Sequence, residues 1–102
     1  VRVKRRLGSK TMELDALLVC KGVALINETK SSLNNRDVDG LAAKLETFDD
    51  FFPEYAGKRC VGIIASLYID ESVVRYATSQ KILCMGMKDD TMRVLNPEAA
   101  QP

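Results

Sequence analysis

Two apolar segments joined by a tight turn constrain the fold of this chain more than any other feature. Met12–Cys20 and Val23–Lys30 are rich in leucine, valine, isoleucine and alanine, and each has the length of a strand. Between them, Lys21 and Gly22 form a polar residue followed by glycine, a pattern typical of hairpin turns. The sequence therefore predicts a β-hairpin at the centre of the fold.

The expected register of this hairpin gathers four charged side chains at its open end. Asp15 is expected opposite Glu28, and Glu13 opposite Lys30. All four side chains would lie on one face of the hairpin, because side chains two positions apart share a face. Two carboxylates facing each other repel, by roughly 3 kcal/mol at ~5 Å and an effective dielectric of ~20. A cation that prefers oxygen ligands, Mg²⁺ or Mn²⁺, would remove that repulsion. Alternatively, Lys30 neutralises one acid and the strand ends are solvated; the spacing leaves both interpretations open.

These residues also resemble a nuclease signature. The spacing resembles the D…ExK motif of the PD-(D/E)XK, or restriction-endonuclease-like, superfamily: Asp15 is followed, after twelve intervening residues, by Glu28-Thr29-Lys30. The similarity extends over residues 1 to about 97, where six segments resemble, in order, a group of uncharacterised prokaryotic members of that superfamily: ELDALLV, INETKSSL, DVDGLAAKLETFDDFFPEY, VGIIASLYID, VVRYA and VLN.

The resemblance implies a metal-dependent nuclease that hydrolyses phosphodiester bonds, with DNA as the expected substrate. Asp15, Glu28 and the main-chain carbonyl of Thr29 would bind Mg²⁺ or Mn²⁺. Lys30 would hold or help deprotonate the attacking water and stabilise charge on the phosphate, so the catalytic residues would be Asp15, Glu28 and Lys30. This division suits the reaction, which needs an activated water and neutralisation of the oxygens that gain charge.

Two questions stay open at this stage. Glu13 is either a second acid behind the metal ligands or, as we expect, a solvated partner of Lys30. The chain itself is either an active nuclease core or a catalytically inactive nuclease-like fold that serves in nucleic-acid binding or assembly. The intact Asp15, Glu28 and Lys30 favour activity, whereas a net charge of only +1 provides no overall basic field for nucleic acid.

Composition excludes several kinds of site. The chain has no histidine, which excludes histidine-based catalysis and histidine-containing zinc sites. Cys20, Cys60 and Cys84 are odd in number and lie in or beside apolar segments, so we expect buried reduced thiols and a cytoplasmic location. No apolar run approaches the ~20 residues of a membrane-spanning helix, so no membrane association is expected.

The remaining patterns predict an α/β fold of order β-β-β-α-β-α-β-β, a mixed central sheet flanked by helices in a restriction-endonuclease-like core. An amphipathic helix is expected to begin at Asn34 or Asn35 and to end at Pro53, with Lys44 among the charged residues that occupy or border its outer face. Asp70 is expected to cap a second helix. The other expected strands are 1–6, 59–66, 82–87 and 91–95.

The ends of the chain raise two further expectations. Residues 1–97 are expected to form a single domain, followed by a frayed tail at 98–102. The sequence begins with Val1, directly at a strand, where related folds carry a helix, so an N-terminal helix is expected to be missing. Strands such as Leu14–Cys20 and Val61–Ala65 are apolar on both faces. One sheet face would then be bare, and we expect a second copy of the chain to cover it in a homodimer.

Overall fold

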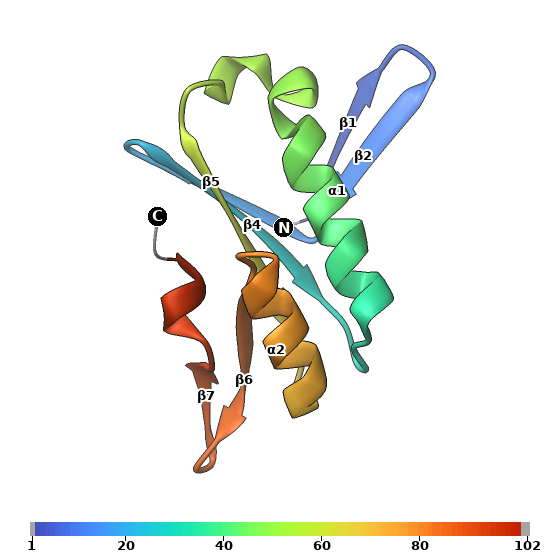
Figure 1. Ribbon diagram of the computed structural model, residues 1–102. Coiled ribbons are helices and arrows are strands. Elements are labelled where there is room, and N and C mark those ends of the chain that lie inside the picture. The colour runs from blue at the N-terminus through green and yellow to red at the C-terminus, as the bar shows by residue number, and fades with distance from the viewer. Residues whose placement is uncertain (1, 101–102) are drawn as a thin grey trace.

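A mixed five-stranded sheet forms the centre of the computed structural model, which describes residues 2–100. The strands lie in the order β3-β4-β5-β6-β7 (Figure 1). The three central strands are parallel, and the two edge strands run antiparallel to their neighbours. Their bounds are Ala16–Cys20 (β3), Val23–Thr29 (β4), Arg59–Ala65 (β5), Leu83–Lys88 (β6) and Thr91–Val94 (β7).

The hairpin of β3 and β4 has the expected register. Cys20 pairs with Val23 and Leu18 pairs with Leu25, on either side of the turn at Lys21-Gly22. Gly22 has a φ of 80°, a left-handed conformation that glycine adopts without steric cost. The turn chemistry therefore fixes the register of the hairpin.

The segment before the hairpin differs from the prediction. The expected strand Met12–Cys20 is broken at Asp15 into β2 (Lys10–Leu14) and β3, and β2 pairs with β1 (Val3–Leu7) in a separate two-stranded sheet. The order is therefore β-β-β-β-α-β-α-β-β, with one strand more than expected. At the break, the main-chain N–H groups of Asp15 and Thr29 donate to side-chain carboxylates instead of to main-chain carbonyls of a strand partner.

Helix α1 (Asn35–Phe51) is fixed by its first turn and by its apolar stripe. The Asn34 side chain accepts from the main-chain N–H of Asp37, and the Asp37 carboxylate accepts from that of Asn34, which completes a capping box. Where α1 crosses β5, a Cβ on Gly62 would lie only 2.8 Å from a methyl group of Leu45. Glycine at this position lets the helix approach the sheet closely. The fully buried apolar side chains of the helix are Val38, Leu41 and Phe48.

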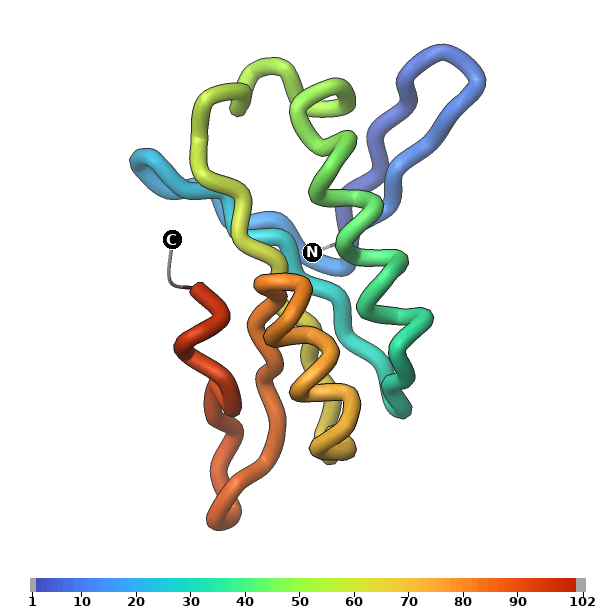
Figure 2. The backbone as a smooth tube through the Cα atoms, in the orientation of Figure 1, coloured from blue at the N-terminus to red at the C-terminus, as the bar shows by residue number. Residues whose placement is uncertain are grey.

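Helix α2 (Glu71–Ser79) lies beside α1 on the same face of the sheet (Figures 1 and 2). Asp70 caps it, as expected, by accepting from the main-chain N–H of Ser72. The two helices therefore cover one face of the sheet. Within residues 2–100, no helix is long and apolar enough to cross a membrane.

The expected tail is ordered up to the last described residue. Residues 97–100 form a short 3-10 helix, η2, in which Ala99 is buried. Before it, the Asn96 amide is buried and makes hydrogen bonds to the main chain of Cys84 and Ile82 and to the Thr78 hydroxyl. These bonds tie Asn96, directly before the short helix, to β6 and α2; residues 101 and 102 lie outside the described range.

The cysteines are all free thiols, but they are not all buried. Cys84 lies in the core, where burial raises the pKa of its thiol to about 11. Cys60 is half-buried, and its thiol pKa is also raised, first by burial and then by Asp49. Cys20 is exposed at the end of β3, which corrects the expectation of burial for this residue, because β3 is an edge strand.

Candidate functional site

Asp15 and Glu28 meet at the open end of the β3–β4 hairpin. Asp15 occupies the bend between β2 and β3, and Glu28 lies near the end of β4. The main-chain N–H of Asp15 donates to Glu28 Oε2 at 3.2 Å, and the main-chain N–H of Thr29 donates to Asp15 Oδ2 at 2.8 Å. These crossed hydrogen bonds hold both carboxylates at one end of the hairpin, as the register predicted.

Glu28 is a largely buried acid, with 8% of its surface exposed. Its position follows from strand alternation, because Ala24 and Ile26 on the same face of β4 are fully buried beneath the helices. The Lys44 ammonium from α1 binds Glu28 Oε1 and also donates to the main-chain carbonyl of Glu13 at 2.6 Å. A buried carboxylate needs such a partner, since an unpaired charge in the interior is costly.

Asp15 is more accessible and has its own set of donors. Its Oδ1 accepts from the Arg2 guanidinium at 3.2 Å, while Oδ2 accepts from the main chain of Thr29. The Thr29 N–H, foremost, and then Arg2 hold the pKa of the Asp15 carboxyl below its ordinary value. Asp15 is therefore ionised across the neutral range.

The predicted pairing of Glu13 with Lys30 is wrong. Glu13 lies in β2, where it pairs with Lys4 of β1, and its carboxylate forms ion pairs with Arg2 and Lys4. The break at Asp15 causes this, because it separates Glu13 from the β3–β4 ladder. Glu13 is thus neither a partner of Lys30 nor in contact with the carboxylate pair through its side chain.

Lys30 continues β4 beyond its last residue. Its main-chain N–H donates to the carbonyl of Ala65 at 2.9 Å, which extends the pairing of β4 with β5. Strand alternation therefore assigns it to the same side of the strand as Glu28. Its side chain is exposed, and it forms no ion pair within the described residues. Lys30 is available to a ligand at the end of the hairpin.

The oxygen atoms at this position are of the chemical type that Mg²⁺ or Mn²⁺ prefers. Carboxylate oxygens of Asp15 and Glu28 and the Thr29 carbonyl are hard ligands, and Mg²⁺ is commonly held by one or two carboxylates together with water and substrate phosphates. Residues 2–100 contain no group of three or more acids or cysteines that could hold a metal ion, so the protein would supply few ligands. The expected bare repulsion between the acids is absent, since Arg2 and Lys44 already balance their charge.

Lys44 and Arg2 are site residues that the sequence interpretation missed. Lys44 was placed with the charged residues that occupy or border the outer face of its helix. It lies three residues after Leu41 and four before Phe48, both fully buried, and therefore borders the apolar stripe. That spacing was the signal that could have identified it. Arg2 carried no comparable signal, because its contact with Asp15 depends on the bend.

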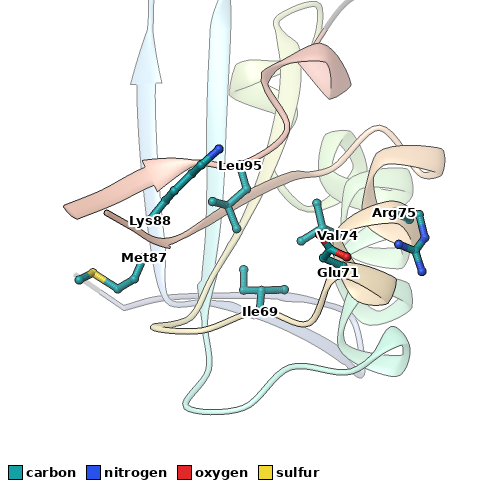
Figure 3. A pocket seen from close by; sticks show the side chains of 7 residues that line it. All are labelled: Ile69, Glu71, Val74, Arg75, Met87, Lys88 and Leu95. Carbon is teal, nitrogen blue, oxygen red and sulfur yellow. The ribbon is translucent and has the colours of Figure 1, made fainter. Parts of the chain in front are cut away.

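Hollows in the surface of the described residues include one beside the candidate site and one apart from it. One, of about 450 Å³, lies between β2 and α1, and its lining includes Lys10 and Lys44. The other, of about 350 Å³, is bordered by Ile69, Val74 and Leu95 (Figure 3). The first adjoins the candidate site through Lys44, whereas the lining of the second contains none of the site residues.

Comparisons with known proteins give no match. No family model matches the chain, and no curated protein or solved structure is significantly similar to it. The structure and the sequence motif therefore carry the functional argument.

The hydrogen bonds of Asp15 predict a pH dependence of stability. Its folded-state pKa is lowered, so its ionised form stabilises the native state above about pH 4, the unfolded value, and that contribution is lost as the pH falls through the folded-state pKa. Asp15→Asn should therefore lower the free energy of unfolding at neutral pH more than at about pH 3. Urea unfolding of the wild type and of Asp15→Asn at both pH values measures this difference in free energy. An equal loss of stability at the two pH values would contradict the prediction.

Proposed function

We propose that this chain is the core of a metal-dependent nuclease with a restriction-endonuclease-like fold, acting on phosphodiester bonds of DNA. One observation carries the proposal: Asp15 and Glu28 are held together by crossed hydrogen bonds at one end of a hairpin, and Lys30 follows two residues after Glu28. The D…ExK resemblance and the mixed α/β sheet support it.

Each residue has a distinct role in this proposal. Asp15, Glu28 and the Thr29 carbonyl hold Mg²⁺ or Mn²⁺, which when bound lowers the pKa of water and neutralises phosphate charge. Lys30 orients the attacking water or takes part in its deprotonation, and its ammonium stabilises charge on the phosphate. Lys44 orients the Glu28 carboxylate and balances its charge through its ion pair from α1.

The DNA contact in this proposal is local, in keeping with the small net charge. The β1–β2 hairpin carries the exposed basic residues Lys4, Arg6 and Lys10, and Lys10 also lines the hollow beside Lys44. Basic side chains of this kind bind phosphates without reading sequence. Lys10 lies on the α1 side of the hairpin, beside the hollow that Lys44 lines, whereas strand alternation places Lys4 and Arg6 on the opposite side.

A second function is favoured by a different observation. Both carboxylates already have cationic partners, Arg2 for Asp15 and Lys44 for Glu28, so the charges are balanced with no bound metal. A catalytically inactive nuclease-like fold that binds nucleic acid or assembles with a partner would have this property.

A plasmid nicking assay with Mg²⁺ or Mn²⁺ separates the two functions. The nuclease proposal predicts nicking that EDTA abolishes and that Glu28→Gln reduces by at least about 100-fold. Glu54→Gln is the control substitution of the same type. Glu54 is an exposed acid that pairs with Arg5, and it is far in sequence from Asp15 and Glu28. Circular dichroism confirms that each variant is folded. DNA binding without nicking would support the inactive fold instead.

A further inference from the structure

One face of the five-stranded sheet is uncovered by any described element. Side chains alternate between the faces, and on the helix side Ile26, Ile64 and Cys84 are fully buried. Their strand neighbours point the other way, and in Figures 1 and 2 both helices lie on one side of the sheet. We call the opposite side the open sheet face; its central apolar residues are Leu18, Leu25, Val61, Ile63, Leu83 and Met85.

The strand registers make these residues one continuous surface. Leu18 pairs with Leu25, which pairs with Val61, so one apolar row crosses three strands. Two residues further along β5, Ile63 pairs with Leu83 of β6. Leu18 is 57% exposed, although it lies in the middle of a strand and not in a loop. Isolated exposed leucines are ordinary, but a continuous apolar sheet face marks an interaction surface.

The chain exposes more surface than a compact monomer of its mass. The chain exposes 6514 Å², whereas a compact monomer of 11.3 kDa exposes about 5,700 Å². The excess of about 800 Å² is of the same order as the area that each partner contributes to a standard protein interface. The projecting β1–β2 hairpin accounts for part of this area, but its exposed residues are mainly basic and polar, so the apolar surface in need of cover lies on the sheet.

The charge pattern of the face identifies the occupant. Among the strand residues that the registers place on it, Arg59 at the start of β5 carries the only charge, and its guanidinium donates to the Ala100 carbonyl. A two-fold interface brings the same surface of both copies together, and a face with almost no charge meets itself without opposing like charges. We propose that a second copy of this chain docks on the open sheet face, and that the two sheets pack face to face in a two-fold homodimer.

This inference is independent of the proposed nuclease function. It depends on strand registers, exposure and total area, and none of its residues belongs to the Asp15–Glu28 site. A chain without nuclease activity would still need cover for this face.

Sedimentation and light scattering of the full chain test the proposal. We expect a dimer at about 100 μM, and Leu18→Glu should weaken it at least about 100-fold because the charge would be buried against apolar side chains. Leu67→Glu is the matched control: Leu67 is also 57% exposed, but it lies in the loop after β5. It should leave the dimer unchanged. Circular dichroism should show that both variants are folded.

A second variant tests whether the interface spans the sheet. Val94 of β7 lies on the open sheet face at the opposite edge from Leu18, in register with Met85, and it is exposed. Val94→Glu should also weaken the dimer. A monomeric wild-type chain, or a dimer that tolerates both Leu18→Glu and Val94→Glu, would overturn the proposal.

Discussion

Replacing Lys30 with methionine is expected to reduce metal-dependent DNA nicking by about 10²- to 10⁴-fold. Methionine keeps an unbranched side chain of similar length but removes the ammonium that would orient water and stabilise phosphate charge. Lys30 is exposed and forms no ion pair within residues 2–100, so its loss should leave the free energy of unfolding nearly unchanged. A loss of rate without a loss of stability identifies a catalytic role.

Lys10→Met is the control for this experiment. Lys10 is also exposed, and it lies at the start of β2, where its side chain forms no ion pair with Asp15 or Glu28. Its replacement removes the same charge and should change nicking only through weaker DNA binding, an effect that added DNA overcomes. Single-turnover rates at saturating DNA separate the two effects. Equal rates for Lys30→Met and Lys10→Met would show that Lys30 has no catalytic role.

The features that were predictable from the sequence are those that short segments determine by themselves. Lys21-Gly22 fixes the β3–β4 register because glycine accepts the left-handed turn conformation. Asn34 and Asp37 form a reciprocal cap within four residues, so local chemistry is sufficient to start α1. The adjacency of Asp15 and Glu28 follows from the same hairpin register and needed no further information.

The break at Asp15 was not predictable from the apolar pattern. Met12 and Leu14 are buried apolar residues of β2, and the apolar residues of β3 begin directly after Asp15, so the whole segment is compatible with one strand. At the bend, two hydrogen bonds join Asp15 to Glu28 and to Thr29, residues thirteen and fourteen positions away, so the bend involves contacts that a local pattern does not contain. Tertiary contacts of this kind override strand propensity.

Asn96 shows the same limit at the other end of the chain. Asn96 directly follows the expected strand 91–95 and precedes Pro97, a pattern that predicts only the end of that strand. In the structure its amide is fully buried and bonds to Ile82, Cys84 and Thr78, residues twelve to eighteen positions away. Such a role depends on which segments meet in three dimensions, and a single polar residue next to proline carries no sign of it.

Lys44 is the residue whose replacement should most clearly separate a metal site from a structural ion pair. Its ammonium binds the carboxylate of Glu28, a residue only 8% exposed, and the main-chain carbonyl of Glu13. Lys44→Met leaves a largely buried carboxylate without its cation. Because the lysine is itself about one-third exposed, we expect a loss of about 2 kcal/mol in the free energy of unfolding without metal, below the value for a fully buried pair.

A bound divalent cation should reverse this loss if Glu28 is a metal ligand. In the wild-type chain the cation competes with Lys44 for Glu28, whereas in Lys44→Met it is the only counter-charge, so millimolar Mg²⁺ or Mn²⁺ should raise the melting temperature more in the variant. Lys58→Met is the control, because Lys58 donates to the Cys20 carbonyl and has no acidic partner within the described residues. It should show no gain in metal response. Thermal unfolding in EDTA and in the presence of Mg²⁺ or Mn²⁺ measures the metal response of each variant. If Lys44→Met is destabilised and metal restores nothing, the Glu28–Lys44 pair is structural, and the inactive nuclease-like fold becomes the better account of this chain.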